Sequence, residues 1–312
     1  MNPPGAYAKL RRMCEWRAVR ISGTLYYIVF NTRSLTGLHA PFARMLNSAR
    51  KNIVTACVAI ATFTFAAMLL AAPQQKTAKK PSKPPVAAAP AAPFRNSESL
   101  SYSGAWLGLS DVLAIQLNAN DDRPFNAHPE WHFQARLQTK NPLHYILAVD
   151  DHFDSYSAQA DFAGEQFEMH LNEGSKVENH ILRIAPSQTP LPAGTTQVQL
   201  LHGTRDALGF LYYLRTANWQ QTTEVRSPVF DGRKVYDVRA TVMTPRSDLA
   251  VAAGKFTATG LSIRPFLNGK ELADTKITLW IAQDAAHTPV LIEVVLPFGS
   301  GRVELTQAVP GK

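Results

Sequence analysis

Cysteine is nearly absent from this 312-residue chain, which contains only Cys14 and Cys57. Both precede Phe94, so the segment 94–312 has none. This absence excludes disulfide bonds, cysteine nucleophiles and zinc–thiolate sites from that segment. Its stability must therefore come from packing.

Acidic residues are scarce at the start of the chain. Before Phe94 there are 13 Lys and Arg residues against one acid, Glu15, which gives a net charge of +12. From Phe94 onward, 19 basic residues face 23 acidic ones, a net charge of −4, although the whole chain carries +8. Because the field of the later segment repels phosphate on average, we exclude nucleic acid as a partner.

Motifs of common catalytic sites are missing as well. The sequence has no G-x-S-x-G nucleophile elbow and no Gly-rich phosphate loop. A Ser-His-Asp set drawn from distant positions stays open, because its members need only be close in space. The sequence therefore names no catalytic residue and implies no cofactor.

Charge is missing altogether from residues 53–72, IVTACVAIATFTFAAMLLAA, which follow Arg50 and Lys51. Twenty uncharged residues at about 1.5 Å of rise each match a hydrocarbon core of about 30 Å, so we predict a transmembrane helix. The basic residues before it place residues 1–52 in the cytoplasm as a basic tail and send the rest across the membrane. The expected location is therefore a membrane, with the residues after this segment exported to its far side.

A cleaved signal peptide is the alternative interpretation of the same segment. If Met45 rather than Met1 is the true start, a short basic leader of signal-like length remains, and residues 1–44 are a misannotated leader. The exported part would then be released from the membrane by cleavage. One sequence does not decide between signal anchor and signal peptide.

Residues 73–93, PQQKTAKKPSKPPVAAAPAAP, contain no acid and no aromatic residue. Such a segment cannot bury enough apolar surface to offset the entropy lost on ordering, and its prolines favour extended polyproline geometry. We predict a disordered linker that holds residues 94–312 away from the membrane.

Residues 94–312 alternate apolar and polar side chains with a period of two, which is typical of half-buried strands. In EQFEMHL, for example, Phe167, Met169 and Leu171 alternate with polar residues, and VYDVRATV does the same. KITLWIA and PVLIEVVL are more continuous and predict deeply buried strands. Asp231-Gly232, Asn268-Gly269 and PFGSG predict hairpin turns. The fold class is therefore all-β, with one curved or barrel-like antiparallel sheet.

One segment, TRDALGFLYYLRTANW, breaks this alternation. Leu208, Leu211, Tyr212 and Arg215 share the spacing of one helical face, with Thr204 as the expected N-cap and Asp206 at the positive end of the helix dipole. We predict one short amphipathic helix that covers the concave face of the sheet.

Arg215 lies on an otherwise apolar helix face, where an unpaired charge is costly to bury. One hypothesis is structural: Arg215 pairs with Asp206 or Glu98 and fixes the helix to the sheet. The other is functional: Arg215, Tyr212 and Tyr213 line a cleft for an anionic or amphipathic ligand. Two tryptophans, Trp106 and Trp280, are assigned to the core, and Trp106 is also kept as a ligand-contact candidate.

Two short motifs contain groups that can bind metals. HPEWH places His128 and His132 four residues apart around Glu130, but without the order of a zinc protease. DDHFD contains Asp150, Asp151, His152 and Asp154 but lacks the glycine typical of calcium loops. We interpret the first as surface histidines at the start of a strand and the second as a solvated strand end, and we predict no metal site.

Several stretches resemble a family catalogued as domain of unknown function 3108, found in exported bacterial proteins. FRNSESLSYSGAWLGL resembles its first strand pair, with Ser97 in place of the usual glycine. DALGFLYYLRT is similar to its most recognisable stretch and VFDGRKVYDV to its next hairpin. The end, from LWIAQDAAHTPV onward, is similar to its closing element, with Ala282 replacing a serine. The resemblance implies a β-rich envelope domain without an assigned reaction.

From these features and this resemblance we expect a non-catalytic bacterial cell-envelope module for binding or scaffolding. It would lie at the inner membrane facing the periplasm, or in the periplasm if the leader is cleaved. Its ligand would be a lipid, a lipoprotein or a cell-wall component in the concavity between sheet and helix. The alternatives are a periplasmic hydrolase with a site assembled from distant loops, and a structural partner that uses a sheet edge. The sequence does not identify the ligand.

Overall fold

The computed structural model describes residues 16–21, 24–29, 92–121, 129–184, 190–297 and 299–312. The predicted membrane segment 53–72 and most of the predicted linker, residues 73–91, lie outside these ranges. Within the ranges, no helix has both the length and the apolar character needed to cross a membrane.

The chain divides into two units, Met1–Ala49 and Arg50–Lys312. In the first unit, strands β1 (Trp16–Ile21) and β2 (Thr24–Val29) pair antiparallel, with Trp16 opposite Val29 and Ile21 opposite Thr24. The sequence analysis treated this stretch only as part of a basic tail and did not anticipate a strand pair.

The second unit contains one sheet of 15 strands and one α-helix among the described residues. The first half consists of β3 (Glu98–Trp106), β4 (Leu109–Asn120), β5 (Glu130–Thr139), the 3₁₀ turn η1 (Leu143–Tyr145), β6 (Asp150–Ala158), β7 (Gly164–Glu173), β8 (Lys176–Arg183) and β9 (Thr195–Gln197). The second half consists of β10 (Arg205–Asp206), α3 (Ala207–Thr216), β11 (Glu224–Phe230), β12 (Val235–Val251), β13 (Gly254–Leu267), β14 (Lys270–Glu271), β15 (Lys276–Ala282), β16 (Pro289–Leu296) and β17 (Gly299–Val309).

The strand order places the first strand of this sheet beside the last. The sheet runs β10-β11-β12-β13-β15-β16-β17-β3-β4-β5-β6-β7-β8-β9, with β14 paired to β13. From β3 the chain meanders to β8, returns through β9, β10 and α3 to the other edge, and meanders back to β17. All pairs are antiparallel except β8–β9 and β10–β11. The prediction of one mainly antiparallel, β-rich sheet is therefore confirmed.

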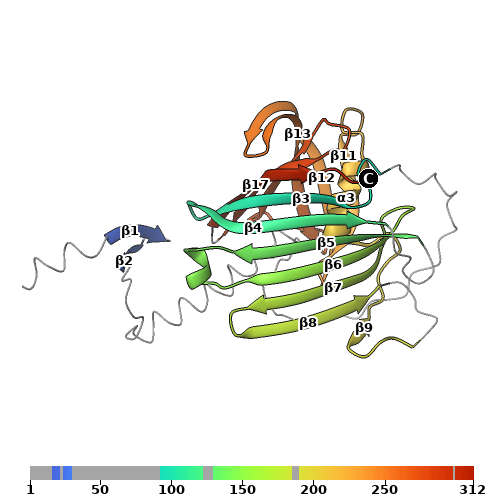
Figure 1. Cartoon of the computed structure of the whole chain (residues 1–312), viewed down its shortest axis with the longest axis horizontal. Helices are drawn as coiled ribbons and strands as arrows, with labels where there is room; N and C mark the ends of the chain where they lie inside the picture. The colour runs from blue at the N-terminus through green and yellow to red at the C-terminus, as the bar shows by residue number, and fades with distance from the viewer. Residues whose placement is uncertain (1–15, 22–23, 30–91, 122–128, 185–189, 298) are drawn as a thin grey trace, which may run out of the picture. The chain divides into compact units, whose positions relative to one another are not determined.

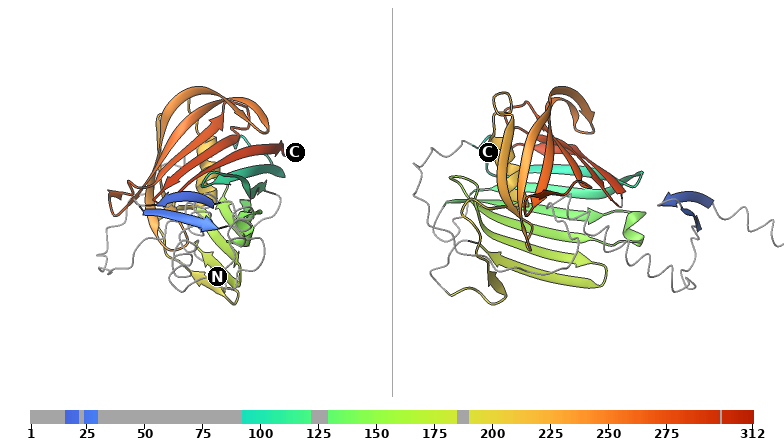
Figure 2. Two further views of the ribbon diagram at one scale, coloured as in Figure 1. Left: turned by 90° about the vertical axis from the view of Figure 1, so that its left-hand side faces the viewer. Right: turned by 180° about the vertical axis from the view of Figure 1, so that it is seen from behind.

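Helix α3 lies inside the curve of the sheet, at one end of the meander β3–β8 (Figures 1 and 2). Its N-cap is Asp206, whose carboxylate accepts hydrogen bonds from the backbone N–H groups of Leu208 and Gly209. The prediction of Thr204 as the cap was wrong, because the Thr204 hydroxyl donates to the carbonyl of Leu201 and the next two residues form β10. The helix is also less amphipathic than predicted, since eight of its ten residues are buried.

Alternation along the strands defines an inner face, which packs against α3, and an outer face. Strand β3 alternates buried and half-buried residues along its whole length, and β5 and β6 do so over most of theirs. Between the inner face and α3 lies a cluster of aromatic rings from β5, from α3 and from the segments next to β3 and β7: Phe94, Trp131, Phe133, Phe162 and Tyr212. These rings fill the space between helix and sheet.

Of the two turns expected from Asn-Gly or Asp-Gly pairs, the one at Asn268-Gly269 has the predicted two residues, whereas the one at Asp231-Gly232 has four, because Phe230 pairs with Val235. Asn268 and Gly269 both have positive φ angles, 52° and 80°, as a two-residue turn between β13 and β14 requires. Between β11 and β12, the Asp231 carboxylate accepts hydrogen bonds from the N–H groups of Arg233 and Lys234, so this turn spans residues 231–234. In the third turn, PFGSG, Phe298 lies outside the described residues.

Candidate functional site

Arg215, near the C-terminus of α3, is fully buried and forms a two-pronged ion pair with Glu98 at the start of β3. Its Nη1 donates to Glu98 Oε1 at 2.6 Å and its Nη2 to Glu98 Oε2 at 2.7 Å. Nη2 and Nε also donate to the backbone carbonyls of Ala286 and His287, at 2.9 and 3.2 Å. The guanidinium therefore links three segments that are far apart in the sequence.

The surroundings of Arg215 favour its charged form. Burial lowers the pKa of Arg215, but the Glu98 carboxylate raises it more, and the net pKa lies above the ordinary value. The rings of Phe94 and Tyr212 face the guanidinium carbon, with their centroids at 4.7 and 5.0 Å. Aromatic faces attract a cation, so they compensate part of its lost hydration. Glu98, rather than Asp206, is thus the carboxylate partner of Arg215.

Asp206 forms a second connection between helix and sheet. Its Oδ1 caps α3, and its Oδ2 accepts a hydrogen bond from the Ser155 hydroxyl of β6 at 2.6 Å. Burial raises the pKa of Asp206 despite these hydrogen bonds. Asp206 and Arg215 together fasten the two ends of α3 to β6 and β3.

The four residues predicted to contact a ligand do not form one exposed site. Tyr212 and Arg215 have no exposed surface, and Trp106 is almost completely buried at the other end of β3 from Glu98. Tyr213 is half-buried, with the Arg205 guanidinium over its ring at 3.6 Å. In the described structure these side chains contribute to the core between sheet and helix.

Trp280, assigned to the core, lies on the outer face of β15 and is half-buried. It covers Gly260 of β13, where a Cβ atom would come within 2.7 Å of the indole ring. Only glycine leaves room for this close contact. Its indole N–H donates to Glu293 at 3.4 Å.

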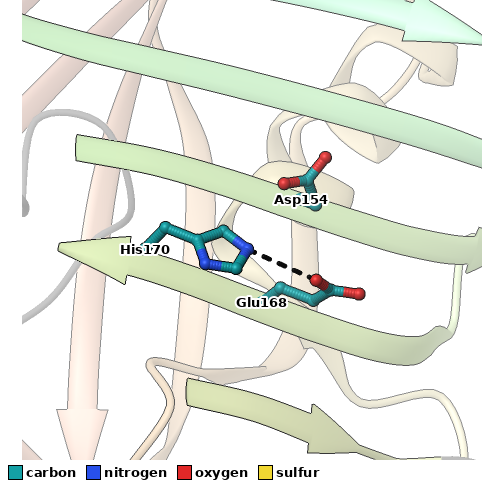
Figure 3. Close-up of side chains that lie close together, drawn as sticks. All are labelled: Asp154, Glu168 and His170. Atoms are coloured by element: carbon teal, nitrogen blue, oxygen red, sulfur yellow. Dashed lines mark ion pairs between the residues drawn. The ribbon is translucent and has the colours of Figure 1, made fainter. Parts of the chain in front are cut away.

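A polar cluster on the outer face of β5–β7 brings parts of three strands together. Asp154 of β6 and Glu168 of β7 are cross-strand partners, and His170 follows on the same face of β7. One potential ligand atom from each of the three side chains lies within 4.8 Å of the other two (Figure 3). His132 of β5 completes the cluster through its Nε2, which lies 2.7 Å from Asp154 Oδ1.

Neighbouring side chains orient the members of this cluster. Asp154 Oδ1 also accepts a hydrogen bond from Gln134 at 2.9 Å. Gln166 donates to Glu168 Oε1 at 2.6 Å, and His170 Nδ1 lies 2.9 Å from Oδ1, the side-chain oxygen of Asn179. Burial alone would raise the pKa of Asp154, but the contacts from His132 and Gln134 outweigh it and hold the pKa below its usual range. Asp154 is therefore a carboxylate at neutral pH.

The sequence analysis found only part of this cluster. It singled out His132 and Asp154 in two separate motifs and interpreted them as a surface histidine and part of a solvated strand end. Glu168 and His170 were seen only as the polar side of EQFEMHL. His128 lies outside the described residues. Glu130 is buried, with its pKa raised to about 8 mainly by that burial, and does not belong to the cluster.

Exposed apolar side chains gather at the end of the meander that lies opposite α3. The connections β3–β4, β5–β6 and β7–β8 all turn at this end (Figure 1). These connections and the first residues of the strands that follow them carry five exposed apolar side chains: Leu107, Leu109, Tyr145, Ile146 and Val177, whose exposed fractions are 54%, 42%, 76%, 44% and 68%. We refer to these five residues as the apolar turns.

The chain matches the model of the family described as "Protein of unknown function (DUF3108)" over residues 100–306. No curated protein matches the chain. The family match spans both halves of the sheet and includes α3.

Among solved structures, the chain is similar to a β-barrel-like protein of the domain of unknown function DUF1849 from Brucella abortus. The TM-score is 0.44 at 11% identity, over 70% of this chain and 99% of the other. It is also similar to a protein from Parabacteroides distasonis described as a "putative lipoprotein", with a TM-score of 0.32 at 8% identity, over 70% and 98% of the two chains.

Proposed function

The chain belongs to the DUF3108 family of proteins of unknown function, and from this premise we propose that it is a non-catalytic binding module of the bacterial cell envelope. The ligand is a lipid-bearing component, which the domain contacts through the apolar turns. Residues 53–72 anchor or export the chain, and residues 73–93 act as the tether.

The apolar turns are the observation that supports this function. Three separate connections place leucine, isoleucine, valine and tyrosine side chains in solvent at one end of the sheet. Exposed apolar groups that gather in this way are typical of surfaces that contact lipids or partner proteins. The aromatic cluster fills the space beside α3, so the turns offer the better contact surface.

The charges beside the turns fit an amphipathic ligand. Lys140 and Lys176 lie next to the turns with roughly half of their surfaces exposed, and each pairs with a carboxylate, Asp111 or Glu178. Apolar tips flanked by lysines suit the boundary between acyl chains and anionic headgroups.

Vesicle binding tests the proposal. The domain from Phe94 to Lys312 is mixed with vesicles of phosphatidylglycerol and phosphatidylethanolamine, and the bound fraction is measured by flotation. We expect binding that falls at least about tenfold in the triple variant Leu107→Asp, Tyr145→Ser, Val177→Asp, because burial of each large apolar side chain contributes roughly 1.5–3 kcal/mol.

Leu201→Asp is the matched control. Leu201 is 78% exposed but lies between β9 and β10, away from the apolar turns. Its replacement should leave vesicle binding unchanged. Absence of binding by the unaltered domain, or equal loss in the control, would refute the proposal, and release of fatty acid from the vesicles would instead support a hydrolase.

A further inference from the structure

We propose that Asp154, Glu168 and His170 bind one divalent transition-metal ion, of the Zn²⁺ type, on the outer face of β6 and β7. This inference is independent of lipid binding, because the cluster lies on a sheet face and the apolar turns lie at the sheet's end. It also reverses the sequence-based prediction that the chain has no metal site.

The spacing of the three side chains suits a small cation. His170 Nε2 and Glu168 Oε2 are 3.4 Å apart, and the group as a whole fits within 4.8 Å. Two ligands bound to a tetrahedral zinc ion at about 2.0–2.2 Å lie about 3.4 Å from each other. The Glu168–His170 pair already has this separation, and a small side-chain adjustment brings in Asp154.

Each ligand side chain is held through one atom and leaves another available. Asn179 contacts His170 at Nδ1, so the opposite ring nitrogen, Nε2, faces Glu168. Gln166 holds Glu168 through Oε1, and Oε2 faces the histidine. Outer contacts that fix the tautomer and orientation of a ligand in this way are typical of metal sites.

The local charge also favours a cation. Asp154 and Glu168 are opposed on adjacent strands, and like charges placed opposite each other destabilise a sheet. Among the described residues, no Lys or Arg forms an ion pair with Asp154 or Glu168. The ion-pair partners of these two carboxylates are His132 and His170. A bound divalent cation would neutralise this pair more completely than the neighbouring imidazoles do.

The set of ligands indicates the class of metal. Two carboxylates and one imidazole suit Zn²⁺ or Mn²⁺, whereas Ca²⁺ and Mg²⁺ prefer oxygen ligands alone and Cu⁺ prefers sulfur. Side-chain exposure of 16–39% at Asp154, Glu168 and His170 lets an ion enter from solvent and leaves a position for water.

Zinc titration of the full-length chain tests this site. The protein is purified in a mild detergent without a polyhistidine tag and titrated with ZnCl₂ by isothermal calorimetry, and CoCl₂ is added in parallel to record the visible absorption of the coordinated ion. We expect one saturable ion per chain. Glu168→Gln, which keeps the side-chain shape, should weaken zinc binding at least about tenfold, and His170→Ala should abolish the cobalt spectrum.

His180→Ala is the matched control. His180 lies on β8 but faces the opposite side of the sheet from His170, and it pairs with Glu178. Its replacement should leave zinc binding unchanged. The proposal is overturned if the unaltered chain binds no zinc, if Glu168→Gln binds as tightly as the unaltered chain, or if Ca²⁺ binds more tightly than Zn²⁺. Circular dichroism checks that each variant is folded.

Discussion

Asp151 and Asp154 lie three residues apart on β6, and they face opposite sides of the sheet. Asp151 points to the inner face and is fully buried, and this burial raises its pKa to about 7 although the Asn172 N–H donates to it. Asp154 points to the outer face, where His132 and Gln134 hold its pKa below the usual range. The pKa values of these two aspartates on one strand are therefore shifted in opposite directions.

The two faces differ in how they accommodate charge. On the inner face, Arg215 and Glu98 are buried together and satisfied by each other and by two backbone carbonyls. On the outer face, Asp154, Glu168 and His170 are hydrogen-bonded on one side and open to solvent on the other. The inner pair is therefore enclosed within the fold, whereas the outer cluster is partly exposed to solvent.

The largest expected effect is the removal of one inner charge. Glu98→Ala leaves Arg215 buried without its carboxylate, and an uncompensated buried charge of this kind costs about 3–5 kcal/mol. We expect the free energy of unfolding to fall by that amount in urea titrations of the domain. A loss below about 1 kcal/mol would show that the pair does not fasten α3 to β3.

A smaller effect concerns the pH dependence contributed by Asp151. Because its folded pKa of about 7 lies above the ordinary value of 3.8, the folded state retains a proton that the unfolded state releases. The stability from this group is present below about pH 4 and is lost as pH rises through 7. Asp151→Asn should therefore gain roughly 2–4 kcal/mol relative to the unaltered domain between pH 4 and pH 8.

The pH test is a difference between two proteins measured by urea unfolding at each pH. Glu130, whose pKa is raised to about 8, contributes a slope of the same sign to both proteins, and that slope cancels. Parallel stability curves for the two proteins would contradict the assignment of Asp151 as a buried titrating group.

The smallest effect is expected for a charge pair on the outer face. Arg136 donates two hydrogen bonds of 2.9 Å to Asp150, and both side chains are more than a third exposed. Exposed pairs contribute about 0–1 kcal/mol, so Arg136→Ala should lower stability by less than about 1 kcal/mol, and less at high salt. A loss as large as that of Glu98→Ala would remove the distinction between the faces.

Local patterns were sufficient for much of the fold. The alternation in EQFEMHL and VYDVRATV corresponds to β7 and β12, and the helical spacing corresponds to α3. These features depend on residues close in sequence. The N-cap was misplaced by two residues because Asp206 is selected partly by Ser155, a contact that the sequence does not reveal.

The outer cluster could not be predicted in the same way. It depends on two registers: which residue of β5 lies opposite which residue of β6, and which residue of β6 lies opposite which residue of β7. The first register is set by the long connection that contains η1, and the second includes an irregularity between Tyr156 and Ser157. A shift of one residue in either pairing would turn a member of the cluster to the other face.

The first and last strands of this sheet along the chain, β3 and β17, pair with each other in its middle. Tyr102 lies opposite Leu305, so the neighbour of the first strand of this sheet is the last strand of the sheet to be synthesised. In a nascent chain, one edge of β3 stays unpaired until β17 has been made, and such edges invite pairing with other chains. Loss of β17 would therefore expose the backbone edge of β3 in the middle of the sheet, whereas loss of an outermost strand would only shorten the sheet.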